Sequence, residues 1–191
     1  MFDSFDTEFR GAKQQPVSYR RKQGASNTME HIPNEDTPLT RCSYYREMCG
    51  LPAKIDPPTL GRITFRAGSI GALTMPAPLG DTVRMHMLSH GSTVGPIIAN
   101  LGSNRWTYLI RPDLPDTDVR LSFELERADV TVVRTGSIVL PSPTAESWAQ
   151  RRWIRLPHNS VRSSGLRVVE VVRAFAWIDR DSRTMVMPRV R

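Results

Sequence analysis

Cysteines, lysines and long apolar runs are scarce in this sequence, and each shortage narrows what the protein can be. Cysteine occurs only as Cys42 and Cys49, without a cysteine–histidine zinc spacing. On a helix their seven-residue spacing would put them about 10 Å apart along the axis, too far for a disulfide, so we expect buried thiols. No apolar run approaches the roughly 18 residues of a membrane span. The acidic start lacks the features of a signal peptide, so we expect a cytoplasmic protein without membrane contact.

Negative charge is also unevenly distributed along the chain. Neither the stretch 57–80 nor the stretch 130–145 contains Asp or Glu, and the formal net charge is +7. Most of this excess lies in residues 146–191, which hold 10 basic and 4 acidic groups. Arginine outnumbers lysine 23 to 3, a bias that suits phosphate binding and that a GC-rich genome also produces.

The residues that most often signal catalysis or metal binding do not form complete motifs. No glycine-rich phosphate loop occurs, and Ser142 has no Gly-x-Ser-x-Gly context. His86 and His90 have the spacing of a two-histidine metal face, but a third ligand is not evident nearby, so we favour a polar helix flank. Asp116 and Asp118 resemble a cation-binding pair, yet they precede an expected helix, where acids serve as caps.

The clearest structural signal is the stretch 94–112. Trp106, Tyr108 and Ile110 alternate with polar and aliphatic residues, which is typical of a strand. A Gly-, Ser- and Asn-rich segment separates this strand from an apolar run, so the pair predicts a β-hairpin. We expect a second β unit, 129–141, to pair against it.

The remaining patterns predict helices and strands around this hairpin. We expect a helix from a Thr40 cap to Cys49 and a strand over 61–67 that continues into, or pairs with, 69–75. Helices should follow to about His90 and over 119–128, a strand over 151–155, and a helix or a strand over 166–175. Together these predict one α+β domain over 38–178 with a mostly antiparallel central sheet and flanking helices. Residues 1–37 should be a disordered tail and 179–191 a basic tail.

Two stretches carry a resemblance to a known family, namely 102–112 and 136–153. The first is a small-residue turn, an aromatic-rich strand and a proline; the second is a glycine turn, an apolar strand ending in Pro and Ser, and an aromatic residue downstream. Over about 60–156 this order of elements resembles the N-terminal domain of bifunctional DNA primase-polymerases, in the archaeo-eukaryotic primase superfamily. The stretches 44–46, 50–53, 74–77 and 102–107 are also similar to short bacterial proteins of unproven function, some labelled DNA-directed RNA polymerase beta subunit. This chain is far too small to be such a subunit.

The resemblance implies a metal site that the sequence does not supply. The family holds two divalent metals with an Asp-x-Asp pair on an early strand and a third aspartate after the second helix. Here the stretches 57–80 and 130–145 lack acids, and the family's histidine falls at about Trp106. Asp129 lies near the third position, but one carboxylate cannot build the site. We therefore expect no enzyme activity, no metal and no cofactor.

Two functions remain open. The first is a non-catalytic primase-polymerase-like accessory protein that binds DNA or RNA, or a replication or transcription protein. Arginines would meet phosphates and exposed aromatics would stack on bases; the candidate residues are Arg105, Trp106, Arg111, Arg151, Arg152, Arg155 and Arg162. The alternative is a structural or regulatory interaction module without nucleic-acid contact, in which Trp106, Tyr108 and Trp153 are core residues. A pocket enzyme is weaker than either, because no nucleophile, base and orienting group converge.

Overall fold

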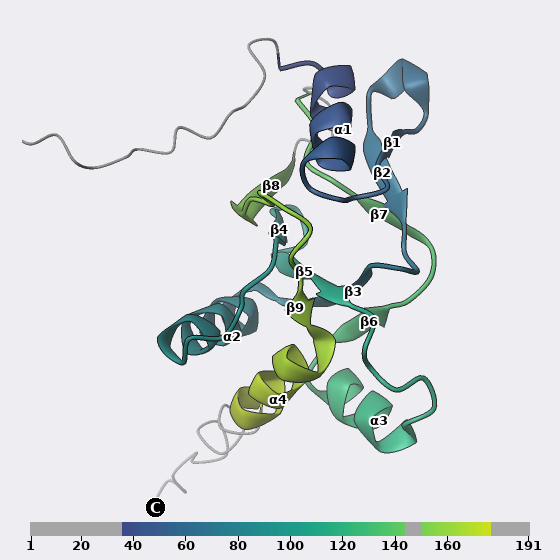
Figure 1. Cartoon of the computed structure of the whole chain (residues 1–191). Coiled ribbons are helices and arrows are strands. Elements are labelled where there is room, and N and C mark those ends of the chain that lie inside the picture. Colours follow the sequence, from purple (N-terminus) through teal and green to yellow (C-terminus); the bar gives the residue numbers. More distant parts are fainter. Residues whose placement is uncertain (1–35, 144–149, 177–191) are drawn as a thin grey trace, which may run out of the picture. The chain divides into compact units, whose positions relative to one another are not determined.

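The computed structural model describes residues 36–143 and 150–176 (Figure 1). The tails expected at 1–37 and 179–191 therefore lie outside the described residues, except for Asp36 and Thr37. None of the described helices is long and apolar enough to span a bilayer.

In chain order the elements are α1 (Pro38–Glu47), β1 (Lys54–Ile55), a 3-10 turn (Pro58–Leu60), β2 (Ile63–Arg66), β3 (Gly71–Pro76), α2 (Ala77–Ser89), β4 (Ile97–Asn100), β5 (Arg105–Arg111), α3 (Val119–Arg127), β6 (Thr131–Val133), β7 (Ser137–Val139), β8 (Arg151–Arg155), β9 (Ser163–Ser164) and α4 (Gly165–Ala176).

The main sheet is built around β5, as the alternation of its residues predicts. Its strand order is β6-β3-β5-β4-β8, and every neighbouring pair is antiparallel. Short β9 adds one parallel pairing to the end of β5. The hairpin of β4 and β5 pairs Ile97 with Tyr108 and Asn100 with Arg105, so its central place in an α+β fold is confirmed.

A second, three-stranded sheet has the order β1-β2-β7 and was not expected. The prediction that 129–141 pairs as one unit with the hairpin is wrong, because β6 joins β3 whereas β7 joins β2. Gly136, at φ 93°, redirects the chain between β6 and β7. Ile138 then packs with Phe65 in a separate core. The expected direct continuation or pairing of 61–67 with 69–75 is wrong too, since β2 and β3 belong to different sheets.

The described helices mostly agree with those predicted from the sequence, but the residue that caps the N-terminus of α1 differs from the prediction. Thr37, rather than Thr40, caps α1: Thr37 Oγ1 accepts a hydrogen bond from Thr40 N at 3.2 Å, and Thr40 Oγ1 accepts one from Thr37 N at 3.0 Å. Pro38 fills the first helical position, where its missing N–H has no partner to lose. At the other end of the domain, α4 settles the open choice for 166–175 as a helix, with four buried valines on its inner face.

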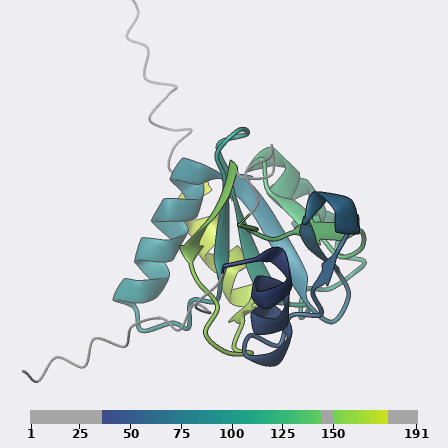
Figure 2. The same cartoon turned by 90° about the horizontal axis from the view of Figure 1, so that it is seen from above.

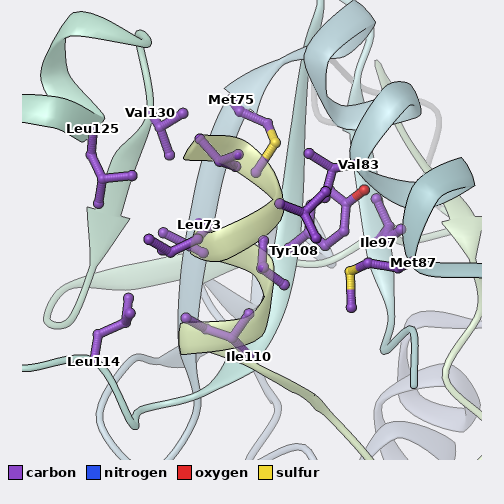
Figure 3. Close-up of a cluster of buried hydrophobic side chains, with 14 of the residues drawn as sticks. Leu73, Met75, Val83, Met87, Ile97, Tyr108, Ile110, Leu114, Leu125 and Val130 are labelled. Atoms are coloured by element: carbon purple, nitrogen blue, oxygen red, sulfur yellow. The ribbon is translucent and has the colours of Figure 1, made fainter. Parts of the chain in front are cut away.

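Two hydrophobic cores lie on opposite faces of the main sheet. Helices α2, α3 and α4 cover one face and enclose the first core (Figures 2 and 3). Its central residue is Tyr108, which is fully buried and whose hydroxyl donates to the Gly80 carbonyl at 2.6 Å. Helix α1 and the smaller sheet cover part of the other face, where Cys42 and Cys49 are buried as free thiols in the second core, as expected.

Candidate nucleic-acid interface

The aromatic residues that could have stacked on bases are packed into the two cores. Tyr108 is fully buried. Trp106 is half-buried against α2, where a Cβ added at Gly80 would come within 3.0 Å of its ring. Trp153 is half-buried as well: its Nε1 donates to the Tyr45 hydroxyl at 2.8 Å, and the two rings meet edge to face at 5.7 Å. A stacking surface therefore has little support from these three rings.

Two of the candidate arginines already have acidic partners. Arg105 Nη1 lies 2.7 Å from Asp129 Oδ2, and its Nη2 donates to the Asp129 carbonyl at 2.7 Å. Arg111 Nη2 lies 3.5 Å from Asp113 Oδ2. A phosphate would have to compete with these carboxylates, so both arginines are poorer candidates than the sequence indicated.

Arg162 is buried and does not fit the interface at all. Only 7% of it is exposed. Its guanidinium donates to the carbonyls of Asn159 at 2.8 Å and Val161 at 2.9 Å, and to the carbonyl of Cys49 just after α1. Burial lowers the pKa of Arg162. The expectation that Arg162 contacts phosphate is corrected here, because its donors face backbone carbonyls inside the domain.

The three arginines of β8, Arg151, Arg152 and Arg155, differ from Arg105, Arg111 and Arg162 in their surroundings. This strand is the last of the main sheet, and among the described residues no strand pairs with its outer edge. Arg151 is half-buried, whereas Arg152 and Arg155 are exposed. Within the described part of the chain, none of the three has an acidic partner. Among the described residues, no carboxylate therefore competes with an outside anion for Arg152 and Arg155.

A β-bulge places two of these arginines on the same face. Arg152 pairs with Ala99, but the register shifts after Trp153, so that Arg155 pairs with Ile97. Because alternate residues of β4 share a face, Arg152 and Arg155 do so too, about 6.6 Å apart along the strand. Without the bulge Arg155 would point to the opposite face. This irregularity has no signature in the sequence.

Arg151 lies on the other face of β8, near a fourth arginine. Burial first, and then the charge of neighbouring Arg62, lowers the pKa of Arg151. Arg62 is held by a hydrogen bond from its Nε to the Asp56 carbonyl at 2.8 Å. The sequence analysis did not single out Arg62; its position in the acid-free stretch 57–80 was the available signal. The Asp56 carboxylate also interacts electrostatically with Arg62, so Arg151 is the less compensated of these two guanidinium groups.

The opposite edge of the sheet, at β6, is neutralised. There Arg134 Nη1 lies 3.0 Å from Asp116 Oδ1, and Arg105 pairs with Asp129. In contrast, the three arginines of β8 have no acidic partner among the described residues; of the other two arginines in 150–169, Arg162 is buried and Arg167 pairs with Glu170. Within the described main sheet, the arginines without an acidic partner are therefore those of β8. We call Arg62, Arg151, Arg152 and Arg155 the β8 arginine edge.

Three threonines lie side by side on neighbouring strands of the main sheet. Thr131, Thr74 and Thr107 are in register across β6, β3 and β5, and the hydroxyls of Thr74 and Thr107 are 3.2 Å apart. Nowhere in 36–143 or 150–176 do three or more His, Cys, Asp or Glu side chains form a group that could hold a metal ion. Asp129, the nearest acid, is paired with Arg105.

The other suspected metal residues have local roles. Asp118 Oδ1 accepts from Leu121 N at 2.9 Å, which confirms it as the cap of α3, and Asp116 pairs with Arg134. The His86 and His90 rings stack at 3.9 Å, and burial, followed by the charges of His90 and Arg167, lowers the pKa of His86. Neither pair converges on a common point with a third ligand.

Comparison with protein-family models, curated proteins and solved structures found no match to this chain.

Proposed function

We propose that the protein is a non-catalytic, primase-polymerase-like accessory protein that binds nucleic acid through the β8 arginine edge. The observation that carries this proposal is the contrast between the two edges of the main sheet. Near β6, Arg134 and Arg105 of β5 are paired with aspartates, whereas no acid among the described residues pairs with Arg151, Arg152 or Arg155 of β8. Nucleic acid is the common cellular polyanion whose phosphates such an edge would attract.

The recognition should be electrostatic and depend little on sequence. Arg152 and Arg155 would contact successive points of a phosphate backbone from one face, and Arg151 with Arg62 from the other. Base reading needs a helix, a ribbon or an exposed ring inserted among base edges. The half-buried Trp106 and Trp153 are packed against the cores and offer no such element.

A non-catalytic role agrees with the threonines on the three strands named above. Two-metal nucleotidyl transfer needs several carboxylates around the metals, and threonine hydroxyls do not replace them. In this proposal the domain keeps the strand arrangement of the resembled family and uses its charged edge for binding alone. A replication or transcription protein that handles nucleic acid would be a natural partner.

A direct test compares two double variants with the same loss of charge. Arg152→Gln/Arg155→Gln removes two charges from β8, whereas Arg46→Gln/Arg120→Gln removes two from the exposed surfaces of α1 and α3. Fluorescence anisotropy with labelled single-stranded and duplex oligonucleotides would measure binding across a range of salt concentrations. We expect the β8 variant to lose affinity and its log–log salt slope on duplex DNA to fall by about 1.8, the value for two phosphate contacts.

The helix variant should keep the wild-type slope. Equal effects of the two double variants would show that only net charge matters and would refute a defined β8 site. Absence of binding at low salt by the wild-type protein would favour the alternative, an interaction module without nucleic-acid contact. That alternative rests on the burial of the aromatic rings and the pairing of Arg105 and Arg111.

A further inference from the structure

We propose that the pocket at the end of β8 is a site for a phosphate monoester, and that a nucleic-acid strand on the β8 arginine edge places its terminal phosphate there. The inference rests on the proposed function for the identity of the strand, but not for the chemistry of the pocket. The pocket has a volume of about 320 Å³. Such a volume lies at the small end of ligand sites, enough for a phosphate and part of the attached sugar.

The pocket continues directly from the arginine edge. Arg155 ends β8, and the residues after it, Leu156 to Asn159, form one wall. Residues 92–96, between α2 and β4, line the pocket as well. Arg155 Nε donates to the Val94 carbonyl at 2.8 Å and so fixes the guanidinium against the segment 92–96. The two terminal nitrogens of Arg155 are left to bind an anion in the fork geometry that phosphate accepts.

Further donors surround this guanidinium. Thr93 and Ser92 bring hydroxyl groups. Arg167, whose Nε donates to Ser92 Oγ at 3.4 Å, lies outside the lining and is paired with Glu170 at 2.8 Å. Asn159 accepts from Val161 N through its Oδ1 at 2.9 Å, which leaves its amide nitrogen as a donor. The described lining contains no Asp or Glu. By contrast, the pocket of about 380 Å³ beside β6 is lined by three acids, Asp116, Glu126 and Asp129, and by Arg134.

The end of α2 does not cancel this attraction. A helix C-terminus carries a partial negative charge on its last carbonyls. Here the Met87 carbonyl already accepts from Ser92 N at 2.8 Å, and the Leu88 carbonyl accepts from Gly91 N at 3.1 Å. These hydrogen bonds direct the carbonyl dipoles into the capping turn.

A monoester fits this site better than the internal diesters of a strand. A terminal phosphate carries about −1.5 to −2 charges and three unsubstituted oxygens, whereas a diester has one charge and two such oxygens. The monoester can accept from a forked guanidinium through two oxygens and from hydroxyl or amide donors through its third, and it carries more charge than a diester. The strand end and a free mononucleotide present the same group, so the experiment must separate these two sources.

The test uses the full chain and measures anisotropy with one short single strand in three forms: 5′-phosphorylated, 3′-phosphorylated and unphosphorylated. We expect a terminal phosphate at one end to raise affinity about tenfold, the size of an added charge-assisted hydrogen bond. Arg155→Gln should abolish that preference. Arg152→Gln, with the same charge loss on the same strand, should weaken all three forms equally and keep the preference.

Adenosine monophosphate and inorganic phosphate are then titrated while backbone amide NMR shifts are followed. Shifts confined to residues 92–96 and 155–161 in wild type, and lost in Arg155→Gln, would establish the pocket even if no oligonucleotide binds and the proposed function fails. If adenosine monophosphate displaces the labelled oligonucleotide, the phosphate that the pocket binds is that of a free nucleotide. If it does not, and the oligonucleotides show the terminal-phosphate preference, the bound phosphate is that of a strand end. No preference and no shift, or a preference that survives Arg155→Gln, would refute the site.

Discussion

Replacing Arg162 tests whether a buried charge can stabilise a fold through backbone carbonyls alone. The side chain is 7% exposed, and its donors join the loop 159–161 to the Cys49 carbonyl after α1. The Arg162 Nε has no hydrogen-bond partner in the described structure. Positive charge beside the last carbonyls of a helix is favourable, because it opposes the negative end of the helix dipole. The arginine thus holds α1 and the β8–β9 connection together.

The expected size of the effect follows from two opposing contributions in Arg162→Met. Each hydrogen bond to a charged donor contributes about 1.5–3 kcal/mol, and carbonyls left without donors add a penalty. Removing a charge from the interior recovers part of its desolvation cost, which makes the net loss smaller than the sum. We expect a loss of about 2–3 kcal/mol in the free energy of unfolding. For a domain of this size that lowers Tm by roughly 4–12 °C.

Urea denaturation and calorimetry of the variant measure this loss, and hydrogen exchange locates it. We expect faster exchange at amides 48–51, whereas the amides of β5 should follow only the global change in stability. Arg152→Met is the matched control, because Arg152 is exposed and its replacement should change stability by less than about 0.5 kcal/mol. An Arg162→Met protein as stable as wild type would show that desolvation offsets the hydrogen bonds, and our reasoning would be wrong.

Four further outcomes are expected. Gly80→Ala should destabilise the domain by about 1–2 kcal/mol in urea denaturation, because the new Cβ would lie 3.0 Å from the Trp106 ring; an unchanged midpoint would mean that the ring shifts freely. Burial alone would raise the pKa of Asp113, but hydrogen bonds from Ser164 and from the backbone N–H groups of α4 lower it. Its contribution to stability should therefore be full above the ordinary pKa of aspartate and be lost as pH falls through the lowered one, and denaturation of Asp113→Asn should show a weaker acid dependence. Purified protein should not extend or synthesise primers with Mg²⁺ or Mn²⁺; extension abolished by a mutation within this chain would contradict us. Arg152→Glu/Arg155→Glu should abolish oligonucleotide binding while the protein keeps its wild-type oligomeric state by light scattering.

Strand periodicity predicted the centre of the fold but not the division into two sheets. β5 is central and long, so its alternation was visible and its hairpin partner lay next to it in sequence. The short strands β2 and β7 alternate equally well in either sheet. Their pairing is decided by the core that Ile63, Phe65 and Ile138 share with α1, which is a tertiary interaction. Likewise, Thr37 and Thr40 are both cap residues, and the overlooked signal was Pro38 at the first helical position.

The candidate site was predictable in composition and unpredictable in geometry. The arginine-rich composition of the segment that holds Arg151, Arg152 and Arg155 indicated these three residues as candidates. Whether an arginine finds a partner depends on distant residues, so the sequence could not separate Arg105, paired with Asp129, from Arg152. It could not show the burial of Arg162 either, because its partners are backbone carbonyls that leave no mark on the pattern. The register shift that changes the direction of Arg155 is a backbone feature, and it too could not be predicted from the sequence.

Charge at the end of a sheet has a structural explanation that competes with binding. An edge strand exposes unpaired N–H and C=O groups, and charged side chains there prevent other chains from adding to the sheet. That role is served by charge of either sign, and β6 carries Arg134 with Asp116 beside it. Protection alone therefore does not explain why β8 carries arginines without a described acid. The glutamate double variant separates the two explanations, because it preserves protection of the edge while reversing the sign that phosphate requires. If binding survives that reversal, the arginines serve the edge and the nucleic-acid contact lies elsewhere.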